Sequence, residues 1–375
     1  MSEKKKDRSF VWKCVCVALA AALLTVSCLY IFKSGSGSSD STGSTASESE
    51  QKGKDPLSLW TENAPLKKQL TEYIGKITDK DSKDFIPVEK RIAVFDFDGT
   101  LFCETDPVYF DYRMFYYRVT EDPEYKDKAS AEEKETAAKI KTMMDTGTSA
   151  KGLEVAHGKG VASAFAGMTI GQFNSYVKMF REKQAPSYNN MKNGEAYYKP
   201  MLQVVNYLKE NDFTVYVISG TDRFIVRGII EDSALDIPPR QIIGSDETIV
   251  ADHQKGEDGM VYQYKLEDKV ITGGEFIIKN LKMNKVSVIQ QEIGLQPVLS
   301  FGNSSGDNSM ANFVIDDNPY PSAAYMLCCD DLERENGNQK KADAMRKSCE
   351  ENGWTAISMK DDWTTIYGDE VTRKK

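Results

Sequence analysis

Two aspartates stand one residue apart at the end of an apolar run in "VFDFDGT", residues 94–100. The residues just before them are apolar and predict a buried strand, so Asp96 and Asp98 would emerge at its carboxyl end. Side chains two residues apart on an extended chain point to the same side, which places both carboxylates together. The chain has only two histidines. This excludes a histidine-rich zinc site and leaves few ways to build a Ser-His-Asp triad, so we expect carboxylate chemistry.

Three further polar groups follow in chain order. They are "SGT" at 219–221, Lys285, and "GNSSGD" at 302–307. The first and last follow predicted strands, and the lysine stands on a predicted helix. In an open parallel sheet, ligands bind beyond the carboxyl ends of the strands, where these groups would meet the two aspartates.

Strands and helices alternate through the second half of the chain. The predicted strands are 91–95, 213–219, 241–245, 297–302 and 323–329, followed by a terminal helix and strand. Helices are predicted at 65–77, 201–211, 222–232, 285–294 and 307–314. This rhythm predicts an α/β fold, a Rossmann-like doubly wound, mostly parallel sheet.

Two insertions interrupt that rhythm. Residues 101–199 are predicted to form a helical cap over the sheet edge, with a capping box at Ser130 and Glu133. Residues 246–282 alternate in polarity around a Gly-Glu-Asp-Gly turn, which predicts a small β-hairpin. The catalytic core would then consist of residues 55–100 and 200–375.

The order and spacing of the four motifs resemble the haloacid dehalogenase (HAD) superfamily, and specifically its phosphoserine phosphatase-like branch. The resemblance covers roughly residues 90 to 330, and its first motif is highly specific. It implies a phosphoric monoester hydrolase in which Asp96 attacks phosphorus and forms an aspartyl-phosphate. Asp98 would be the general acid and base. Dehalogenases do not need this second acid, so its presence favours a phosphatase.

The resemblance also implies a Mg²⁺ ion, because two carboxylates would otherwise repel the phosphate. Its predicted ligands are Asp96, Asp98 through its backbone carbonyl, and Asp307. Many relatives have Gly-Asp at the start of the fourth motif, whereas this chain has Gly302 and Asn303. Asn303 still offers a carbonyl oxygen, at the loss of one negative charge that could weaken Mg²⁺ binding.

The remaining motif residues are predicted to hold the phosphate. Ser219, Gly220 and Thr221 would donate a hydroxyl and backbone N–H groups at a helix N-terminus. Lys285 would neutralise charge on the nucleophile and the phosphoryl group. Arg223, directly after the second motif, is a further candidate anion contact, although a helix-surface role fits it equally.

Specificity is predicted to come from the cap and from the aromatic-rich segment 101–118. Most of these aromatic residues would pack the cap, and a few would form a wall for a cationic leaving group. Glu104 or Asp106 could pair with an amine. The predicted substrate is thus a small phosphorylated metabolite, and the hypothesis for its class is a phosphorylated amino-alcohol such as phosphoserine or phosphocholine.

Two other functions use the same residues. The chain could be a catalytically weak, membrane-tethered module that binds a phosphate ligand, with Asn303 as a first sign of decay. It could also be a phosphotransferase that passes the phosphoryl group to an acceptor other than water.

The N-terminus predicts a membrane anchor. Residues 14–32 form an uncharged apolar stretch after a lysine-rich start, long enough for one transmembrane helix with the following chain outside. A lipoprotein at Cys28 and a cleaved, secreted form remain alternatives. Residues 34–54 are rich in Ser and Gly and predict a flexible tether. The catalytic domain is therefore expected to be extracytoplasmic.

The net charge of −9 and the lack of a basic stripe argue against a nucleic-acid partner, and no protein partner is indicated. Seven cysteines do not make a disulfide scaffold in a chain of 375 residues. Outside the cell, Cys328 or Cys329 could pair with Cys349.

Overall fold

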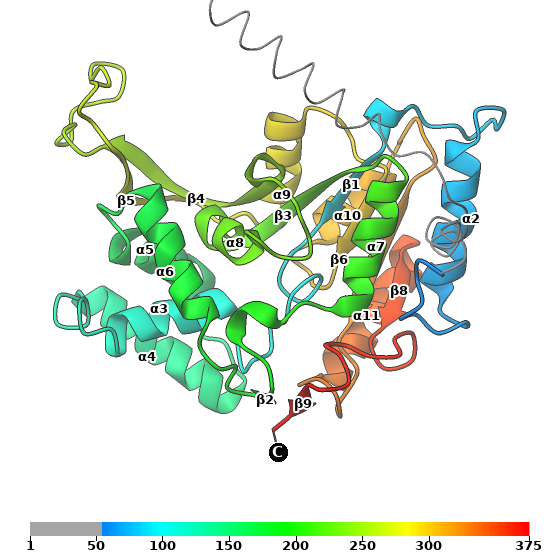
Figure 1. Cartoon of the computed structure of the whole chain (residues 1–375), viewed down its shortest axis with the longest axis horizontal. Helices are drawn as coiled ribbons and strands as arrows, with labels where there is room; N and C mark the ends of the chain where they lie inside the picture. The colour runs from blue at the N-terminus through cyan, green and yellow to red at the C-terminus, as the bar shows by residue number, and fades with distance from the viewer. Residues whose placement is uncertain (1–54, 375) are drawn as a thin grey trace, which may run out of the picture. The chain divides into compact units, whose positions relative to one another are not determined.

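The computed structural model describes residues 55–374, and its core is one seven-stranded sheet (Figure 1). The strand order is β5-β4-β3-β1-β6-β7-β8. The strands are β1 (Ile92–Phe95), β3 (Thr214–Asp222), β4 (Ile242–Ala251), β5 (Val270–Ile278), β6 (Leu299–Gly302), β7 (Ala323–Cys328) and β8 (Thr355–Ser358). All neighbouring pairs are parallel except β4 with β5. The prediction of a mostly parallel α/β sheet is confirmed.

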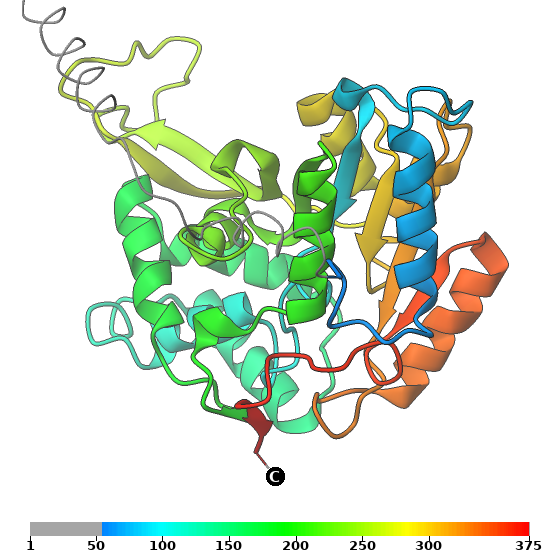
Figure 2. The same ribbon diagram turned by 45° about the vertical axis from the view of Figure 1, so that its right-hand side comes forward.

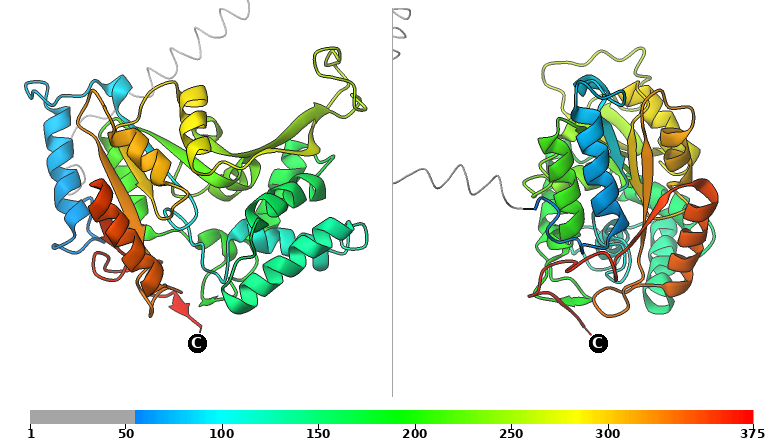
Figure 3. Two further views of the ribbon diagram at one scale, coloured as in Figure 1. Left: turned by 180° about the vertical axis from the view of Figure 1, so that it is seen from behind. Right: turned by 90° about the vertical axis from the view of Figure 1, so that its right-hand side faces the viewer.

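Strand β1 lies in the middle of the sheet and is covered on both faces. Ala93 and Phe95 pack in the same apolar core as residues of α2 (Pro65–Thr78) and α7 (Lys199–Glu210). Val94 packs on the other face, with residues of α9 (Met283–Val288) and α10 (Asn308–Ile315). Figure 3 shows these helix pairs on opposite sides of the sheet. This double burial explains the uninterrupted apolar run of β1, because neither face meets water.

Other elements complete the core. Helix α8 (Arg223–Ile230) follows β3, and α11 (Gln339–Asn352) packs on β7 and β8. Short helical turns are η2 (Val88–Lys90), η3 (Asn193–Glu195), η4 (Pro239–Gln241) and η5 (Ile289–Ile293).

Four helices lie within the range predicted for the cap (Figure 2). They are α3 (Phe110–Thr120), α4 (Ala131–Thr146), α5 (Leu153–Ala164) and α6 (Ile170–Arg181). The Ser130–Glu133 capping box is present at the start of α4, and Thr169 caps α6 in a second box with Gln172. Both boxes satisfy backbone N–H groups that the first helical turn leaves without partners.

The predicted hairpin is present, but it is continuous with the sheet. Strand β4 begins parallel to β3 and then runs on to pair antiparallel with β5, with register shifts on both sides. The hairpin also holds the cap, because Thr272 exchanges backbone hydrogen bonds with Gly167 and Met168, each 2.9 Å long. Its hydroxyl donates to the carbonyl of Phe165 at 2.5 Å.

The chain end returns to the cap on another side. Strand β2 (Tyr188–Asn189) pairs antiparallel with β9 (Thr372–Arg373). Behind this pair Glu335 is fully buried, and its carboxylate accepts hydrogen bonds from the hydroxyls of Thr105, Tyr188 and Tyr367. One buried carboxylate therefore joins the segment after β1, the base of the cap and the C-terminal segment.

The predicted membrane segment and tether, residues 1–54, lie outside the described residues. Within residues 55–374, no helix combines the length and apolar character that a membrane span requires. Cys328, Cys329 and Cys349 are free thiols in the structure, so the disulfide alternative is not realised there.

We expect Glu335→Ala to lower the free energy of unfolding by about 3 kcal/mol, because it leaves two buried tyrosine hydroxyls and the partly buried hydroxyl of Thr105 without their acceptor. Urea denaturation of the two proteins measures the difference. Glu333→Ala, an exposed glutamate two residues away, is the matched control and should change little. Equal stability of the Glu335 variant and the wild type would contradict the joining role of this carboxylate.

Candidate active site

The two aspartates of the first motif leave the central strand at its carboxyl end. Asp96 continues the sheet through one bond, its N–H donating to the carbonyl of Phe301 at 2.9 Å. The chain then turns at Gly99, whose φ is +77°. A Cβ at Gly99 would also collide with the side-chain amide of Asn303. Glycine is thus required both for the backbone conformation and for the approach of the fourth motif.

Lys285 joins the first and fourth motifs. Its Nζ lies 2.5 Å from Oδ1 of Asp96 and 2.6 Å from Oδ1 of Asp307. The lysine is 0% exposed, and Asp96 and Asp307 are 6% and 1% exposed. A buried cation between two carboxylates compensates charges that would be costly alone. The lysine, the weakest of the sequence motifs, is the group that connects the others.

Burial and the charge of Asp307 raise the pKa of Asp96 to about 7, against the opposing effect of Lys285. Burial alone would lower the pKa of Lys285, but Asp307 and Asp96 outweigh it and raise that pKa. The lysine is therefore charged, and this one cation lies between two carboxyl groups.

Asp307 organises the loop that follows β6. Its Oδ2 accepts the N–H groups of Asn303 and Ser304 at 3.1 and 3.0 Å, and the Ser304 hydroxyl at 3.2 Å. The remaining oxygen faces Lys285. The Asn303 side chain reaches Gly99 and Glu104, so it lies among the site residues as predicted from its motif position.

Asp98 meets Thr221 of the second motif and Asp111 of the cap. The Thr221 hydroxyl lies 2.7 Å from Oδ2 of Asp98 and 3.1 Å from Oδ2 of Asp111. Burial, Asp111 and Asp96 raise the pKa of Asp98 well above its usual range. Its Oδ1 is buried and has no hydrogen-bond partner. Asp98 is thus set to hold a proton and to offer one free oxygen.

In the second motif, the structure corrects the predicted phosphate contact of Ser219. Ser219 is fully buried and its hydroxyl accepts the N–H of Thr221 at 3.0 Å, so it does not line the site. Gly220 and Thr221 do. The cause is a register shift of β3 between Ile218 and Asp222, which extends the strand past the motif. The N-terminus of α8 is also unavailable to phosphate, because the Asp222 carboxylate already accepts its first N–H groups.

Arg223 and Asp106, both candidate substrate contacts, are engaged elsewhere. Arg223 forms ion pairs with Asp246 and with Glu292, the latter at 2.8 Å, and does not line the site. Asp106 is buried against Arg113 at 3.0 Å and accepts the N–H of Ser187 at 2.7 Å. Because each charge has a partner within the protein, the structure favours the helix-surface alternative for Arg223 and leaves Glu104 as the candidate amine contact in place of Asp106.

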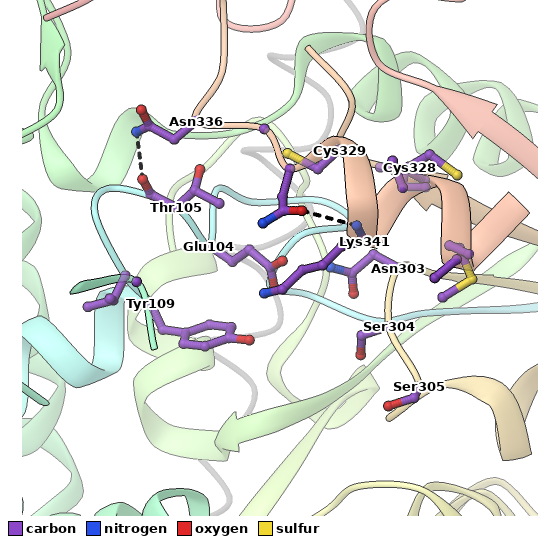
Figure 4. A pocket seen from close by; sticks show the side chains of 18 of the residues that line it. Glu104, Thr105, Tyr109, Asn303, Ser304, Ser305, Cys328, Cys329, Asn336 and Lys341 are labelled. Carbon is purple, nitrogen blue, oxygen red and sulfur yellow. Dashed lines mark hydrogen bonds between the residues drawn. The ribbon is translucent and has the colours of Figure 1, made fainter. Parts of the chain in front are cut away.

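Two adjoining cavities lie between cap and core. The inner cavity, about 190 Å³, is lined by six carboxyl groups, from Asp96, Asp98, Glu104, Asp111, Glu154 and Asp307, and Lys285 is buried against two of them. The outer cavity, about 730 Å³, opens from it toward the start of α11 (Figure 4). Glu104 lines both, as its predicted substrate role requires, and burial raises its pKa to about 7.

Sequence reasoning missed four charged residues of the inner cavity: Asp111, Glu154, Lys279 and Lys341. Asp111 lies within the aromatic segment that was expected to reach the site, and Tyr109 and Tyr112 of that segment do line it. Nothing in the local sequence distinguishes Lys279 or Lys341 from other surface lysines.

The donors fit a hard divalent cation. Asp96 and Asp307 supply carboxylate oxygens, and the amide of Asn303 lies in the same cavity, while Asp98 would contribute its backbone carbonyl, as the resemblance implies. Mg²⁺ takes oxygen ligands and keeps several waters, so it needs only a few protein groups. Within residues 55–374, the only three acidic or histidine side chains close enough to share one ion are Asp252, His253 and Asp268, on the hairpin. A cation at the active site would thus use two carboxylates and neutral oxygens, as the resemblance implies.

The family model for haloacid dehalogenase-like hydrolases matches residues 93–312. This span runs from β1 to α10 and includes all four motifs. The chain belongs to the haloacid dehalogenase-like hydrolase family. The recognition from the sequence, including the prediction of a hydrolase, is confirmed at this level. No curated protein sequence matches this haloacid dehalogenase-like hydrolase.

Solved structures resemble it distantly. A protein of unknown function from Anaerococcus prevotii is 13% identical, with 78% of this chain and 91% of that chain covered and a TM-score of 0.48. Cytosolic 5'-nucleotidase IIIB bound to cytidine is 11% identical, with 81% and 90% covered and a TM-score of 0.48. A probable phosphoserine phosphatase from Vibrio cholerae is 12% identical, with 73% and 62% covered and a TM-score of 0.35.

In the absence of divalent cations, we expect Lys285→Met to cost about 3 kcal/mol of stability at pH 7.5, because two buried carboxylates lose their counter-charge. The loss should be smaller at pH 5. Without the lysine, the pKa of Asp96, already raised by burial to about 7, rises further, so protonation of this carboxyl group stabilises the folded state at low pH. Urea denaturation with EDTA at both pH values measures this.

Lys282→Met, at an exposed lysine on the same segment, is the control and should show little change at either pH. Adding Asp307→Asn to Lys285→Met should recover part of the lost stability. A loss that does not depend on pH would show that packing, rather than charge, is what Lys285 contributes.

Proposed function

We propose that the protein is a Mg²⁺-dependent phosphatase that hydrolyses a small phosphomonoester through an aspartyl-phosphate on Asp96. The observation that carries this proposal is the buried contact of Lys285 with both Asp96 and Asp307, beside a second carboxylate with a raised pKa. This is the arrangement expected of a nucleophile, a charge-neutralising lysine and a separate acid.

In the first step, an oxygen of Asp96 attacks phosphorus and the bond between phosphorus and the ester oxygen breaks. Protonated Asp98 gives its proton to the leaving oxygen, which departs as an alcohol. In the second step, Asp98, now ionised, takes a proton from water as the water oxygen attacks phosphorus. Inorganic phosphate leaves and Asp96 is restored.

The other site residues bind and orient. Lys285 holds the Asp96 carboxylate in place and opposes the rise in its pKa, which favours the ionised form that attacks. Thr221 hydrogen-bonds the acid, and the N–H groups after Gly302 keep Asp307 oriented. When bound, Mg²⁺ supplies positive charge that draws the phosphate to the nucleophile and stabilises charge on its oxygens.

The amino-alcohol hypothesis for the substrate now depends on Glu104 alone, since Asp106 is paired with Arg113. The membrane anchor and the extracytoplasmic location likewise stay predictions, because they depend on residues 1–54.

Turnover of p-nitrophenyl phosphate by residues 55–375 with Mg²⁺ tests the enzyme proposal. Asp96→Asn should reduce it to background, because the amide cannot form the acyl phosphate. Asp98→Asn should lower kcat/KM by about 10²-fold or more. Its effect should be larger for phenyl phosphate than for p-nitrophenyl phosphate, because phenolate is the poorer leaving group and needs the proton more.

A wild type no more active than Asp96→Asn would favour the alternative of a catalytically weak binding module. The phosphotransferase alternative predicts that, with an added alcohol, more p-nitrophenol than inorganic phosphate is released. Hydrolysis predicts equal amounts.

Mg²⁺ should raise the Tm of the wild type through binding to the folded state. Asn303→Asp should tighten Mg²⁺ binding by about tenfold, because it restores a negative charge to an oxygen-ligand site. Asp307→Asn should abolish the Tm shift. Thermal denaturation at increasing Mg²⁺ concentration measures all three proteins, with Asp316→Asn, an exposed acid beyond α10, as the control. A full Tm shift in Asp307→Asn would refute the metal site.

A further inference from the structure

The outer cavity is continuous with the catalytic site. Six residues line both cavities: Glu104, Tyr109, Met143, Asn303, Ser304 and Lys341. The outer cavity, about 730 Å³, is within the range of pockets that hold whole organic ligands, about 300–1,000 Å³. A phosphate group in the inner cavity would leave its ester substituent directed toward this space.

The outer cavity is lined by both apolar and polar side chains. Apolar side chains from the cap and from the core include Val108, Met143, Leu327 and Met345. The polar side chains of the lining include Ser304, Ser305, Asn308, Asn336 and Asn338. Such a lining suits a large leaving group that is itself partly apolar and partly polar.

Lys341 is the only cation among the residues that line the outer cavity. It stands in the first turn of α11, where its N–H donates to the N-cap side chain of Asn338 at 3.0 Å. In Figure 4 its side chain extends from the helix toward the carboxyl group of Glu104. Within residues 55–374, however, no carboxylate lies within 4.0 Å of its Nζ.

Glu104 lines the same two cavities as this lysine, but the two side chains do not form an ion pair. A helix N-terminus adds further positive potential on the same side of the cavity.

We propose that Lys341 is a specificity-determining residue that binds an anionic group, a carboxylate or a second phosphate, on the leaving group of the substrate. The rest of that leaving group occupies the outer cavity, in contact with its apolar side chains. The inference rests on the proposed phosphatase activity and replaces the cationic leaving group of the amino-alcohol hypothesis. It assigns the preference for charge to the core helix α11 rather than to the cap.

Matched aryl phosphates test the charge preference in the full-length protein with Mg²⁺. The anionic probes are 4-carboxyphenyl phosphate and 1,4-phenylene bisphosphate. The neutral probe of the same size is 4-carbamoylphenyl phosphate, and the cationic probe is 4-(aminomethyl)phenyl phosphate. Ratios of kcat/KM between wild type and variant are compared for each probe, so that intrinsic differences in leaving-group reactivity cancel.

Lys341→Met should lower kcat/KM for an anionic probe about tenfold relative to the neutral probe, the size expected for loss of one hydrogen bond to a charged group. Lys341→Glu should lower it further and raise kcat/KM for the cationic probe. Lys340→Met, at the neighbouring exposed lysine that lines neither cavity, should leave every ratio unchanged. The anionic probe that is more affected identifies carboxylate or phosphate as the bound group.

Equal ratios for all probes in Lys341→Met, with turnover intact, would overturn the inference and leave the phosphatase proposal standing. A wild-type preference for the cationic probe would also overturn it, in favour of Glu104. A different result would refute the proposed phosphatase activity itself: the wild type would turn over none of the probes. The occupied space is tested by Ala344→Trp, which should reduce turnover of 4-biphenyl phosphate more than that of phenyl phosphate.

Discussion

The contact of Lys285 with Asp96 and Asp307 is the interaction on which the rest of the site depends. It places a charged amine, fully out of water, between carboxylates from the first and fourth motifs. Breaking such a group by removing one member is far more costly than never building it. The sheet order puts β1 beside both β3 and β6, so the carboxyl ends of these strands lie close together. Lys285 offsets the repulsion between the carboxylates that this arrangement brings together.

The same constraint explains why the site is poised for a cation. Three lysines, Lys279, Lys285 and Lys341, lie at the inner cavity, while six acidic side chains line it. Burial, and after it the neighbouring carboxylates, raises the pKa values of Asp96, Asp98 and Glu104. A divalent ion or a protonated acid relieves the excess of acidic groups, and the chemistry of a phosphatase uses both.

The sequence predicted the sheet and most of the site because these depend on local signals. The apolar run before Asp96 and the alternation after Pro200 are periodic patterns, and the motifs are short and in order. The role of Ser219 was predicted wrongly because a register shift in β3 cannot be read from strand propensity. Arg223 and Asp106 were assigned to substrate because their partners, Asp246 with Glu292 and Arg113, are set by tertiary packing. Lys341 escaped notice for the same reason, since its helix reaches the cavity only through the fold of the C-terminal segment.

The cap is attached to the core on more than one side. The hairpin binds it through Thr272, and the C-terminal segment binds it through β2–β9 and the Glu335 carboxylate. A lid fastened at two separate places cannot swing about a single hinge without breaking one of its attachments. Substrate must therefore reach the inner cavity through the outer cavity, which stays open to solvent. The width and charge of the outer cavity then select the molecules that reach the nucleophile, before the reaction begins.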